Sequence, residues 1–299
     1  IARGLQSLGT LGSGNHFLEI QSVSKVVDQG CAKEWGLYEG QLVVMIHSGS
    51  RGLGHQVCTD HVRDLEQQYK LQEGIWKHEG WRFEIPDRQL AAAPLFSDAG
   101  QHYFDSMNAA ANFAFANRSA LTQRLRDVLR LEMDELGEAT TLYDVAHNIA
   151  KIETHTINGV DCSCCVHRKG ATRAFSKGHQ ELPATFHSTG QPVLVPGNME
   201  HGSWILSGSS EGDHHAFRSS CHGAGRSLSR TIAKQTLDAN VIKSRLESNG
   251  IRVHASTPNV LAEEAPEAYK NVDSVIEMTK NAGLAQPVVR LQPQLVVKG

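Results

Sequence analysis

The sequence lacks the features that mark membrane, secreted or bulk nucleic-acid-binding proteins. No run approaches the roughly 18 apolar residues of a membrane span, and no segment combines the charged, apolar and small-residue parts of a secretory signal. The 29 Lys and Arg residues are outnumbered by 32 Asp and Glu residues, giving a formal net charge of −3. This balance excludes a strongly basic, histone-like binder but leaves room for a local basic groove.

Cysteine is also scarce. The six cysteines show no paired Cys-x-x-Cys spacing of the zinc type, and six in 299 residues are too few for a disulfide scaffold. We therefore expect reduced thiols and a cytoplasmic location. The cysteines are Cys31, Cys58, Cys162, Cys164, Cys165 and Cys221.

Flexible linkers, internal repeats and a regular βαβ alternation are missing as well. The chain begins with Ile1 rather than Met, so we expect it to be a fragment or a processed product. Apolar runs between glycine-rich turns predict strands, and apolar residues at three- and four-residue spacing predict helices. The pattern is typical of an α+β fold with a mixed β-sheet core and peripheral helices, not of a Rossmann or P-loop fold. The expected strands include Phe17–Ile20, Val23–Val27, Gln41–Ile46, Pro192–Val195, Trp204–Leu206 and Val288–Val297; the expected helices cover Gly100–Gly137, Ser227–Leu246 and Ala265–Lys280.

Histidine is abundant, with 16 residues, and four histidines lie beside small residues at the ends of expected strands. Glycine-rich loops let backbone N–H groups approach an anion, and histidine there can bind a metal or attack a phosphorus atom. Each histidine taken alone is more often a hydrogen-bonded structural residue, but four in similar surroundings favour a divalent metal site. The segments are Gly12–Glu19, His47–His55, Asp144–Lys151 and Cys221–Arg226.

The segment around His222 is the most informative. A phosphate held by the amides of Gly223–Gly225 and by the start of the following helix would lie beside His222, with Arg226 and Arg230 as charge clamps. Such an arrangement suits a histidine that forms a phosphoramidate with a nucleotide. The structural alternative is a helix cap with solvated arginines.

Six motifs, in one order along the chain, resemble the RtcB family of RNA ligases. The resemblance runs from Leu8 to Lys298-Gly299, with a less distinctive stretch over Val57–Gly100. The motifs are Gly-Ser-Gly-Asn-His-Phe, His-Ser-Gly-Ser-Arg-Gly-Leu-Gly-His, Val-Ala-His-Asn-Ile-Ala, Val-His-Arg-Lys-Gly-Ala, Val-Pro-Gly-Asn-Met and Ser-Cys-His-Gly-Ala-Gly-Arg.

The resemblance implies an RtcB-like catalytic domain over residues 1–299. It assigns His16, His47 and His147 as manganese ligands, in a family site of two Mn²⁺ ions, and His222 as the residue that accepts GMP from GTP. The implied guanylate-binding residues are Asn15, His16, Phe17, Leu18, Glu19, His147, Asn148, Pro196, Gly197, Asn198, Met199, Ser203, His222, Gly223, Ala224, Gly225, Tyr269 and Lys298.

The implied reaction joins an RNA 3′-phosphate or 2′,3′-cyclic phosphate end to a 5′-hydroxyl end through a GMP–histidine intermediate, as in RNA splicing and repair. Phosphoryl transfer of this kind depends on positioning and charge neutralisation. We expect RNA contacts at Arg51, Arg168, Lys169, Arg226 and Arg230, with no aromatic platform for sequence-specific reading.

The sequence departs from the family in two places. The family's Asp-x-x-Cys-Gly ligand motif lies upstream of Gly-Ser-Gly-Asn-His-Phe; here Asp28 and Cys31 have that spacing, but they follow His16 and Ala32 replaces the glycine. We therefore expect the N-terminal metal-ligand segment to be missing and this chain alone to ligate weakly or not at all. The second departure is Asn198, Glu200 and His201, where Glu200 would bring a carboxylate near the nucleotide phosphates unless it is metal-bound or turned away.

Two alternatives remain open at this point. A non-catalytic RNA- or nucleotide-binding relative would keep the groove without binding manganese. A histidine-rich metallohydrolase would act as a phosphatase or cyclic phosphodiesterase indifferent to GTP, and it leaves the His-Gly-Ala-Gly-Arg loop unexplained.

Overall fold

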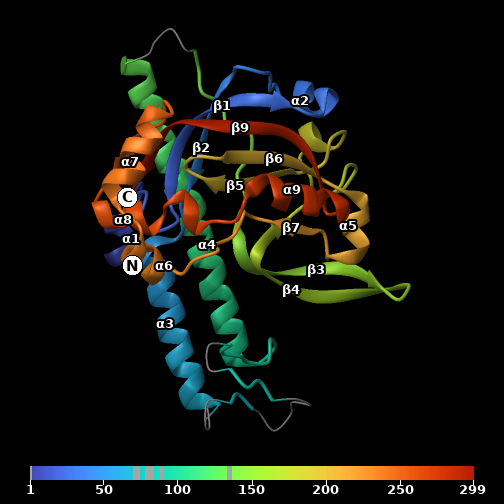
Figure 1. Ribbon diagram of the computed structural model, residues 1–299. Coiled ribbons are helices and arrows are strands. Elements are labelled where there is room, and N and C mark those ends of the chain that lie inside the picture. Colours follow the sequence, from blue (N-terminus) through green and yellow to red (C-terminus); the bar gives the residue numbers. More distant parts are fainter. Residues whose placement is uncertain (1, 70–74, 78–83, 88–89, 133–136) are drawn as a thin grey trace. The chain divides into compact units, whose positions relative to one another are not determined.

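The computed structural model describes residues 2–69, 75–77, 84–87, 90–132 and 137–299, and the chain forms two compact units (Figure 1). Unit 1 comprises Ile1–Thr10 and Ser48–Gly137, and unit 2 comprises Leu11–His47 and Glu138–Gly299. The single catalytic domain expected over residues 1–299 stays a prediction.

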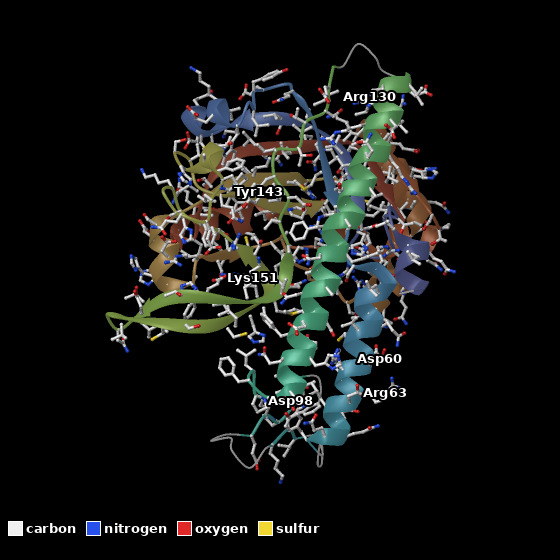
Figure 2. The ribbon with its side chains drawn as sticks, turned by 180° about the vertical axis from the view of Figure 1, so that it is seen from behind. Asp60, Arg63, Asp98, Arg130, Tyr143 and Lys151 are labelled. Carbon is white, nitrogen blue, oxygen red and sulfur yellow. The ribbon has the colours of Figure 1, made fainter. Side chains whose placement is uncertain are left out.

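Unit 1 is helical. Its helices are α1 (Ala2–Ser7), α3 (Arg51–Gln68) and α4 (Asp98–Glu132). Figure 2 shows Asp98 at the start of α4 and Asp60 and Arg63 on α3, where their side chains form an ion pair at 2.7 Å. The side chain of Asn117 on α4 is fully buried and bonds to the backbone of Gly9, Thr10 and Gly49, which fixes these loops to the helix.

Unit 2 contains a six-stranded sheet in the order β2-β1-β9-β6-β5, with β8 added beside β9. All neighbours are antiparallel except β8 and β9, which are parallel. One face packs into a core that includes Phe17, Phe175 and Phe186. The strands are β1 (Phe17–Val26), β2 (Leu42–His47), β5 (Pro192–Asn198), β6 (Gly202–Gly208), β8 (Arg252–Ala255) and β9 (Ala285–Lys298).

A second, three-stranded antiparallel sheet in the same unit has the order β3-β4-β7. It consists of β3 (His147–Ile157), β4 (Val160–Arg173) and the short β7 (Ser219–Cys221), and the β3–β4 hairpin extends well beyond β7 in Figure 1. Two sheets together with the helices of the chain make the mixed α+β architecture that the sequence predicts.

Helices of unit 2 cover the edges and faces of these sheets. On α9, Val272 and Ile276 pack against β5 and β6, while α7 and α8 bury Ile242, Leu246 and Leu261 in a separate cluster. No helix in the described ranges is long and apolar enough to cross a membrane. The helices are α2 (Gln29–Glu34), α5 (Ser210–His215), α6 (Arg230–Thr236), α7 (Ala239–Ser248), α8 (Pro258–Glu263) and α9 (Val272–Asn281), with 3₁₀ turns at Ala184–Phe186 and Pro266–Ala268.

The C-terminal half differs from the sequence prediction in its helices. The helix expected over Ser227–Leu246 is two helices, because the Asp238 side chain accepts hydrogen bonds from the amides of Asn240 and Val241 and starts α7 afresh. The helix expected over Ala265–Lys280 begins only at Val272, where the Asn271 side chain caps it.

Candidate active site

Four histidine side chains of unit 2 come together at the ends of four strands. His16 immediately precedes β1, His47 ends β2, His147 begins β3 and His222 follows β7. The Nε2 atoms of His47 and His147 lie 2.9 Å apart, and the rings of His147 and His222 stack with centroids 4.2 Å apart. The His16 ring centroid lies 5.8 Å from that of His47. The structure thus brings all four sequence-predicted histidines into one cluster.

Strand pairing explains why these residues meet. In the large sheet, Phe17 pairs with His47, so the residue before β1 lies beside the end of β2. In the small sheet, Thr172 of β4 pairs with His147 on one side and with Ser220 on the other. The start of β3 and the end of β7 therefore project from the same end of that sheet.

The electrostatics of the cluster favour neutral imidazoles. Burial lowers the pKa of His47 well below its ordinary value, and the neighbouring histidines lower it further. Burial also lowers the pKa of His222, and the positive charge of Lys169 lowers it a little further. Neutral imidazole is the form that binds metal ions and that acts as a nucleophile.

Part of the cluster has the geometry of a divalent metal site. Two imidazole nitrogens at about 2.1 Å from one ion, at right angles, would lie about 3.0 Å apart, which matches the distance between the Nε2 atoms of His47 and His147. No set of three or more His, Cys, Asp or Glu side chains within the described ranges is arranged as a complete site. The described residues therefore fit a metal through this converging pair, with His16 adjacent.

The loop after His222 is shaped by its small residues. The Ala224 amide donates to the Pro196 carbonyl at 3.0 Å, and a Cβ on Gly223 would lie 3.3 Å from that same oxygen. Gly225 has φ of +78°, a conformation that side chains disfavour. Through the Ala224 hydrogen bond, this loop holds His222 close to β5, whose residues Pro196–Asn198 line a neighbouring pocket.

The two arginines that follow are not free clamps. Arg226 donates to the Glu264 carboxylate at 3.2 Å and to the carbonyl of Glu263 at 2.6 Å, and Arg230 forms an ion pair with Glu263 at 2.9 Å. Helix α6 begins at Arg230, so its N-terminus does not directly follow His222 as the sequence pattern suggested.

A small pocket lies beside this loop, and its lining overlaps with part of the predicted guanylate set. Ten of its eleven lining residues belong to the predicted set, and Glu264 is the addition. The lining residues are Asn15, Phe17, Glu19, Pro196, Gly197, Asn198, Met199, Ser203, Glu264, Tyr269 and Lys298.

Glu19 and Lys298 give the pocket buried charges. Glu19 is 3% exposed, and burial raises the pKa of its carboxyl to about 7, although the charge of Lys298 and the hydrogen bond from Gln21 oppose this rise. The Gln21 amide donates to Glu19 at 2.6 Å and to the hydroxyl of Ser203 at 3.2 Å. Burial lowers the pKa of Lys298, while Glu264 and Glu19 raise it. Such groups are suited to hydrogen bonds with a polar ligand.

Glu264 is the pocket residue that the sequence reasoning missed. Its fully buried carboxylate accepts hydrogen bonds from Tyr269 and Arg226, and its oxygen lies 3.9 Å from the Lys298 ammonium. The Tyr269 hydroxyl oxygen also lies 3.0 Å from the side-chain oxygen of Asn15. The available signal was the pair of acidic residues, Glu263 and Glu264, between apolar Ala262 and Ala265, since carboxylates are seldom buried without a partner.

Other predicted nucleotide residues have structural surroundings. Leu18 lies within β1, between Ile46 of β2 and Val297 of β9. The Asn148 side chain accepts a hydrogen bond from the Gly170 amide at 2.9 Å, and its own φ is +54°. These residues shape the strands next to the histidines.

The divergent loop after β5 does not direct a carboxylate into the pocket. Glu200 turns toward α7, where it bonds to Asn249 at 3.1 Å and pairs with Arg245 at 3.3 Å. Asn198 accepts from the amides of Glu200 and His201 and closes the turn. The conflict with nucleotide phosphates expected for Glu200 is therefore avoided.

Among the predicted RNA contacts, Arg168 needs correction. Its side chain is buried, and its guanidinium is bound by Glu153, Ser219 and the Phe217 carbonyl, so it presents no exposed cation. Lys169, the next residue on the strand, is exposed. Arg51 lies in unit 1 as the first residue of α3 and donates to the Thr10 hydroxyl at 3.2 Å.

Asp28 and Cys31 have a structural role. The Asp28 carboxylate accepts from the Cys31 amide and caps α2. Cys31 is buried in the core, and burial raises the pKa of its thiol to about 12, with Asp28 and Glu34 contributing. The carboxylate and the thiol are thus held in local structural contacts of α2 and the core.

Comparison with known proteins identifies the family of this chain. The family model described as "tRNA-splicing ligase RtcB" matches residues 1–299. The chain is 49% identical to the tRNA-splicing ligase RtcB of Archaeoglobus fulgidus over 99% of this chain and 60% of that protein, and 47% identical to that of Pyrococcus abyssi over 99% of this chain and 32% of that protein. It is 50% identical to the RNA-splicing ligase RtcB of Mycobacterium bovis over 100% of this chain and 66% of that protein. The chain spans about one third to two thirds of the length of these relatives. By its motifs, its fold and this similarity, the chain belongs to the RtcB family.

Proposed function

We propose that this chain carries the core of an RNA ligase that uses GTP and manganese to join 3′-phosphate or 2′,3′-cyclic phosphate ends to 5′-hydroxyl ends. The observation that carries the proposal is the position of His222. Its half-buried imidazole stacks on His147 in the histidine cluster, and its glycine loop is hydrogen-bonded to Pro196 of the pocket lining.

His222 is the proposed nucleophile. A neutral imidazole nitrogen forms a bond to the α-phosphorus of GTP, and pyrophosphate leaves with the electron pair of the broken P–O bond. The guanylyl group then passes to the RNA 3′-phosphate as the P–N bond breaks, and the 5′-hydroxyl displaces GMP to form the phosphodiester. The lowered pKa of His222 supports this role because it keeps the imidazole unprotonated near neutral pH.

His16, His47 and His147 are the proposed manganese ligands. The 2.9 Å separation of the His47 and His147 Nε2 atoms supports this assignment. When bound, a divalent ion would neutralise charge on the phosphates. Strand pairings hold His47 and His147 in position, and His16 lies next to the paired Phe17.

The pocket beside the His222 loop is the proposed guanylate site. Guanine presents N–H donors at its ring edge, and Glu19 provides a buried acceptor for them. Ser203, Tyr269 and Lys298 supply further polar groups around the same space. Of the predicted RNA contacts, Lys169 is best supported because it is exposed and its charge acts on the pKa of His222.

A cytoplasmic location stays a prediction.

Labelling with GTP that carries a radioactive α-phosphate tests the proposal. The full-length protein should become labelled, His222→Ala should abolish the label, and His254→Ala, at an exposed histidine on β8, should keep it. Labelling that persists unchanged in His222→Ala would refute the proposed nucleophile. Failure of the labelled protein to seal RNA with 3′-phosphate and 5′-hydroxyl ends would refute the proposed substrate.

A further inference from the structure

A buried ion pair joins the three strands of the small sheet. Arg168 of β4 donates to both carboxylate oxygens of Glu153 on β3, at 2.7 and 2.9 Å, and its Nε donates to the Ser219 hydroxyl on β7 at 2.9 Å. Both members of the pair are at most 8% exposed. His155 lies 2.9 Å from the same carboxylate and completes its coordination by hydrogen bonds.

This pair is not explained by stability alone. Removing two charges from water is costly, and well-packed apolar residues of similar volume often serve a fold as well or better. Burial raises the pKa of Glu153, but hydrogen bonds from Arg168 and His155 outweigh burial and lower it overall, so the carboxylate stays ionised. A planar guanidinium with a bidentate partner instead fixes geometry, because its donors point in set directions.

The backbone held by Arg168 is strained. Phe217 and Arg218, just before β7, have φ of +49° and +52°, which residues other than glycine disfavour. Arg168 donates to the Phe217 carbonyl at 2.8 Å, and Arg218 donates to the Thr154 carbonyl of β3 at 3.1 Å. The Phe217 ring packs edge-on against His155, with centroids 5.1 Å apart. These contacts hold the strained turn in place.

The turn leads directly to His222. Strand β7 has only three residues, and Ser219, its first, is the one bonded to Arg168. Two residues separate this anchor from His222, whose ring is stacked on His147 at the start of β3. Because Glu153 lies on β3 as well, the ion pair connects the strand of one histidine to the strand of the other.

We propose that Arg168 and Glu153 are positioning residues that set the place of β7 and so aim His222 at its substrate. This role rests on the proposed function, in which His222 accepts the guanylyl group. It replaces the RNA contact that the sequence suggested for Arg168. The role predicts a defect in the rate of His222 guanylylation and not in GTP binding, because the pocket residues lie outside the small sheet.

Three variants of the full-length protein test this role. Glu153→Gln removes the negative charge, and Arg168→Lys keeps the positive charge but loses the two parallel N–H donors of the guanidinium. The double variant Glu153→Leu/Arg168→Met replaces the pair by apolar side chains that can preserve the fold. In single-turnover labelling at saturating GTP, each folded variant should be about 10- to 100-fold slower, while the GTP concentration for half-maximal rate stays within about twofold. Thermal unfolding identifies the folded variants.

Glu181→Gln is the matched control. Glu181 forms an ion pair at 3.1 Å with Arg173, which is the last residue of β4, the strand that also carries Arg168. The Glu181 side chain is 59% exposed, so this ion pair is not buried. This control should label at the unmodified rate. Folded variants of the buried pair that also label at that rate, or whose defect lies only in half-saturating GTP, would overturn the positioning role. Absence of labelling in the unmodified protein would instead overturn the proposed function, and the positioning role with it.

Discussion

The carboxyl group of Glu19 should make the protein less stable as the pH rises. An acid whose pKa is lowered by an ion pair has the opposite effect. Its side chain lies on the buried face of β1, which also carries Phe17, Gln21 and Val23. Burial raises the pKa of Glu19 from 4.5 to about 7, although Lys298 and Gln21 oppose the rise. Between these two pH values the folded protein therefore binds a proton that the unfolded chain has released.

The sign and size of the effect follow from this difference. Below the unfolded value the carboxyl is protonated in both states, and above about pH 7 the folded protein must keep a buried charge. Stability is therefore lost as the pH rises through the folded value. At 1.36 kcal/mol per pH unit, the interval from 4.5 to about 7 corresponds to about 3 kcal/mol.

Urea unfolding of the protein and of Glu19→Gln, between about pH 4 and about pH 8, measures this contribution. The fluorescence of Trp35 and Trp204, both buried in unit 2, can follow the transition. Because glutamine resembles the protonated acid, the variant should match the protein at the acid end and exceed its free energy of unfolding by about 3 kcal/mol at the alkaline end. A difference between the two proteins that does not change with pH would refute the reasoning.

Three further predictions concern stability and thiol reactivity. Asn117→Ala should destabilise unit 1 by about 3 kcal/mol in thermal unfolding, because it leaves buried backbone amides unpaired. Gly202→Ala should cost about 3 kcal/mol or more in urea unfolding, since φ is +81° and the new Cβ would lie 2.0 Å from the Leu291 carbonyl oxygen; Gly36→Ala, at φ of +69° with open space around it, should cost only about 1 kcal/mol. A thiol reagent should modify exposed Cys58 at least about 100-fold faster than buried Cys31, whose thiol pKa is raised to about 12.

Each of these predictions can fail in a defined way. A loss below about 1 kcal/mol for Asn117→Ala would mean that water replaces the lost amide. Equal losses for the two glycine variants would contradict the close approach of Gly202 to β9. Equal modification rates for the two thiols in the folded protein would contradict the burial of Cys31.

The regular elements could largely be predicted from the sequence. The helix expected over Gly100–Gly137 corresponds to α4, and the segment Val288–Val297 lies within β9, because long periodic patterns leave few alternatives. Local side-chain hydrogen bonds were harder to foresee. The apolar spacing predicted helix starts closer to the N-terminus than the observed starts after Asp238 and Asn271. Spacing alone does not show which polar side chain accepts the backbone hydrogen bonds that cap a helix.

The candidate site was predictable in its residues but not in its internal pairing. The histidine cluster and most of the pocket lining were identified through motifs. Arg168 was misplaced because neighbouring strand residues face opposite ways, and the sequence does not reveal that Arg168 faces Glu153 while Lys169 faces solvent. Glu264 was missed because its partners Arg226 and Lys298 lie far from it in sequence and become its neighbours only on folding.

The most direct test of the account is to locate the guanylyl group by mass spectrometry. The full-length protein, incubated with GTP and Mn²⁺, would be digested under alkaline conditions, which preserve a P–N bond. We expect guanylate on His222 alone, in the peptide that contains Cys221-His-Gly-Ala-Gly-Arg226. Guanylate on a lysine or on any other histidine, with His222 unmodified, would contradict it.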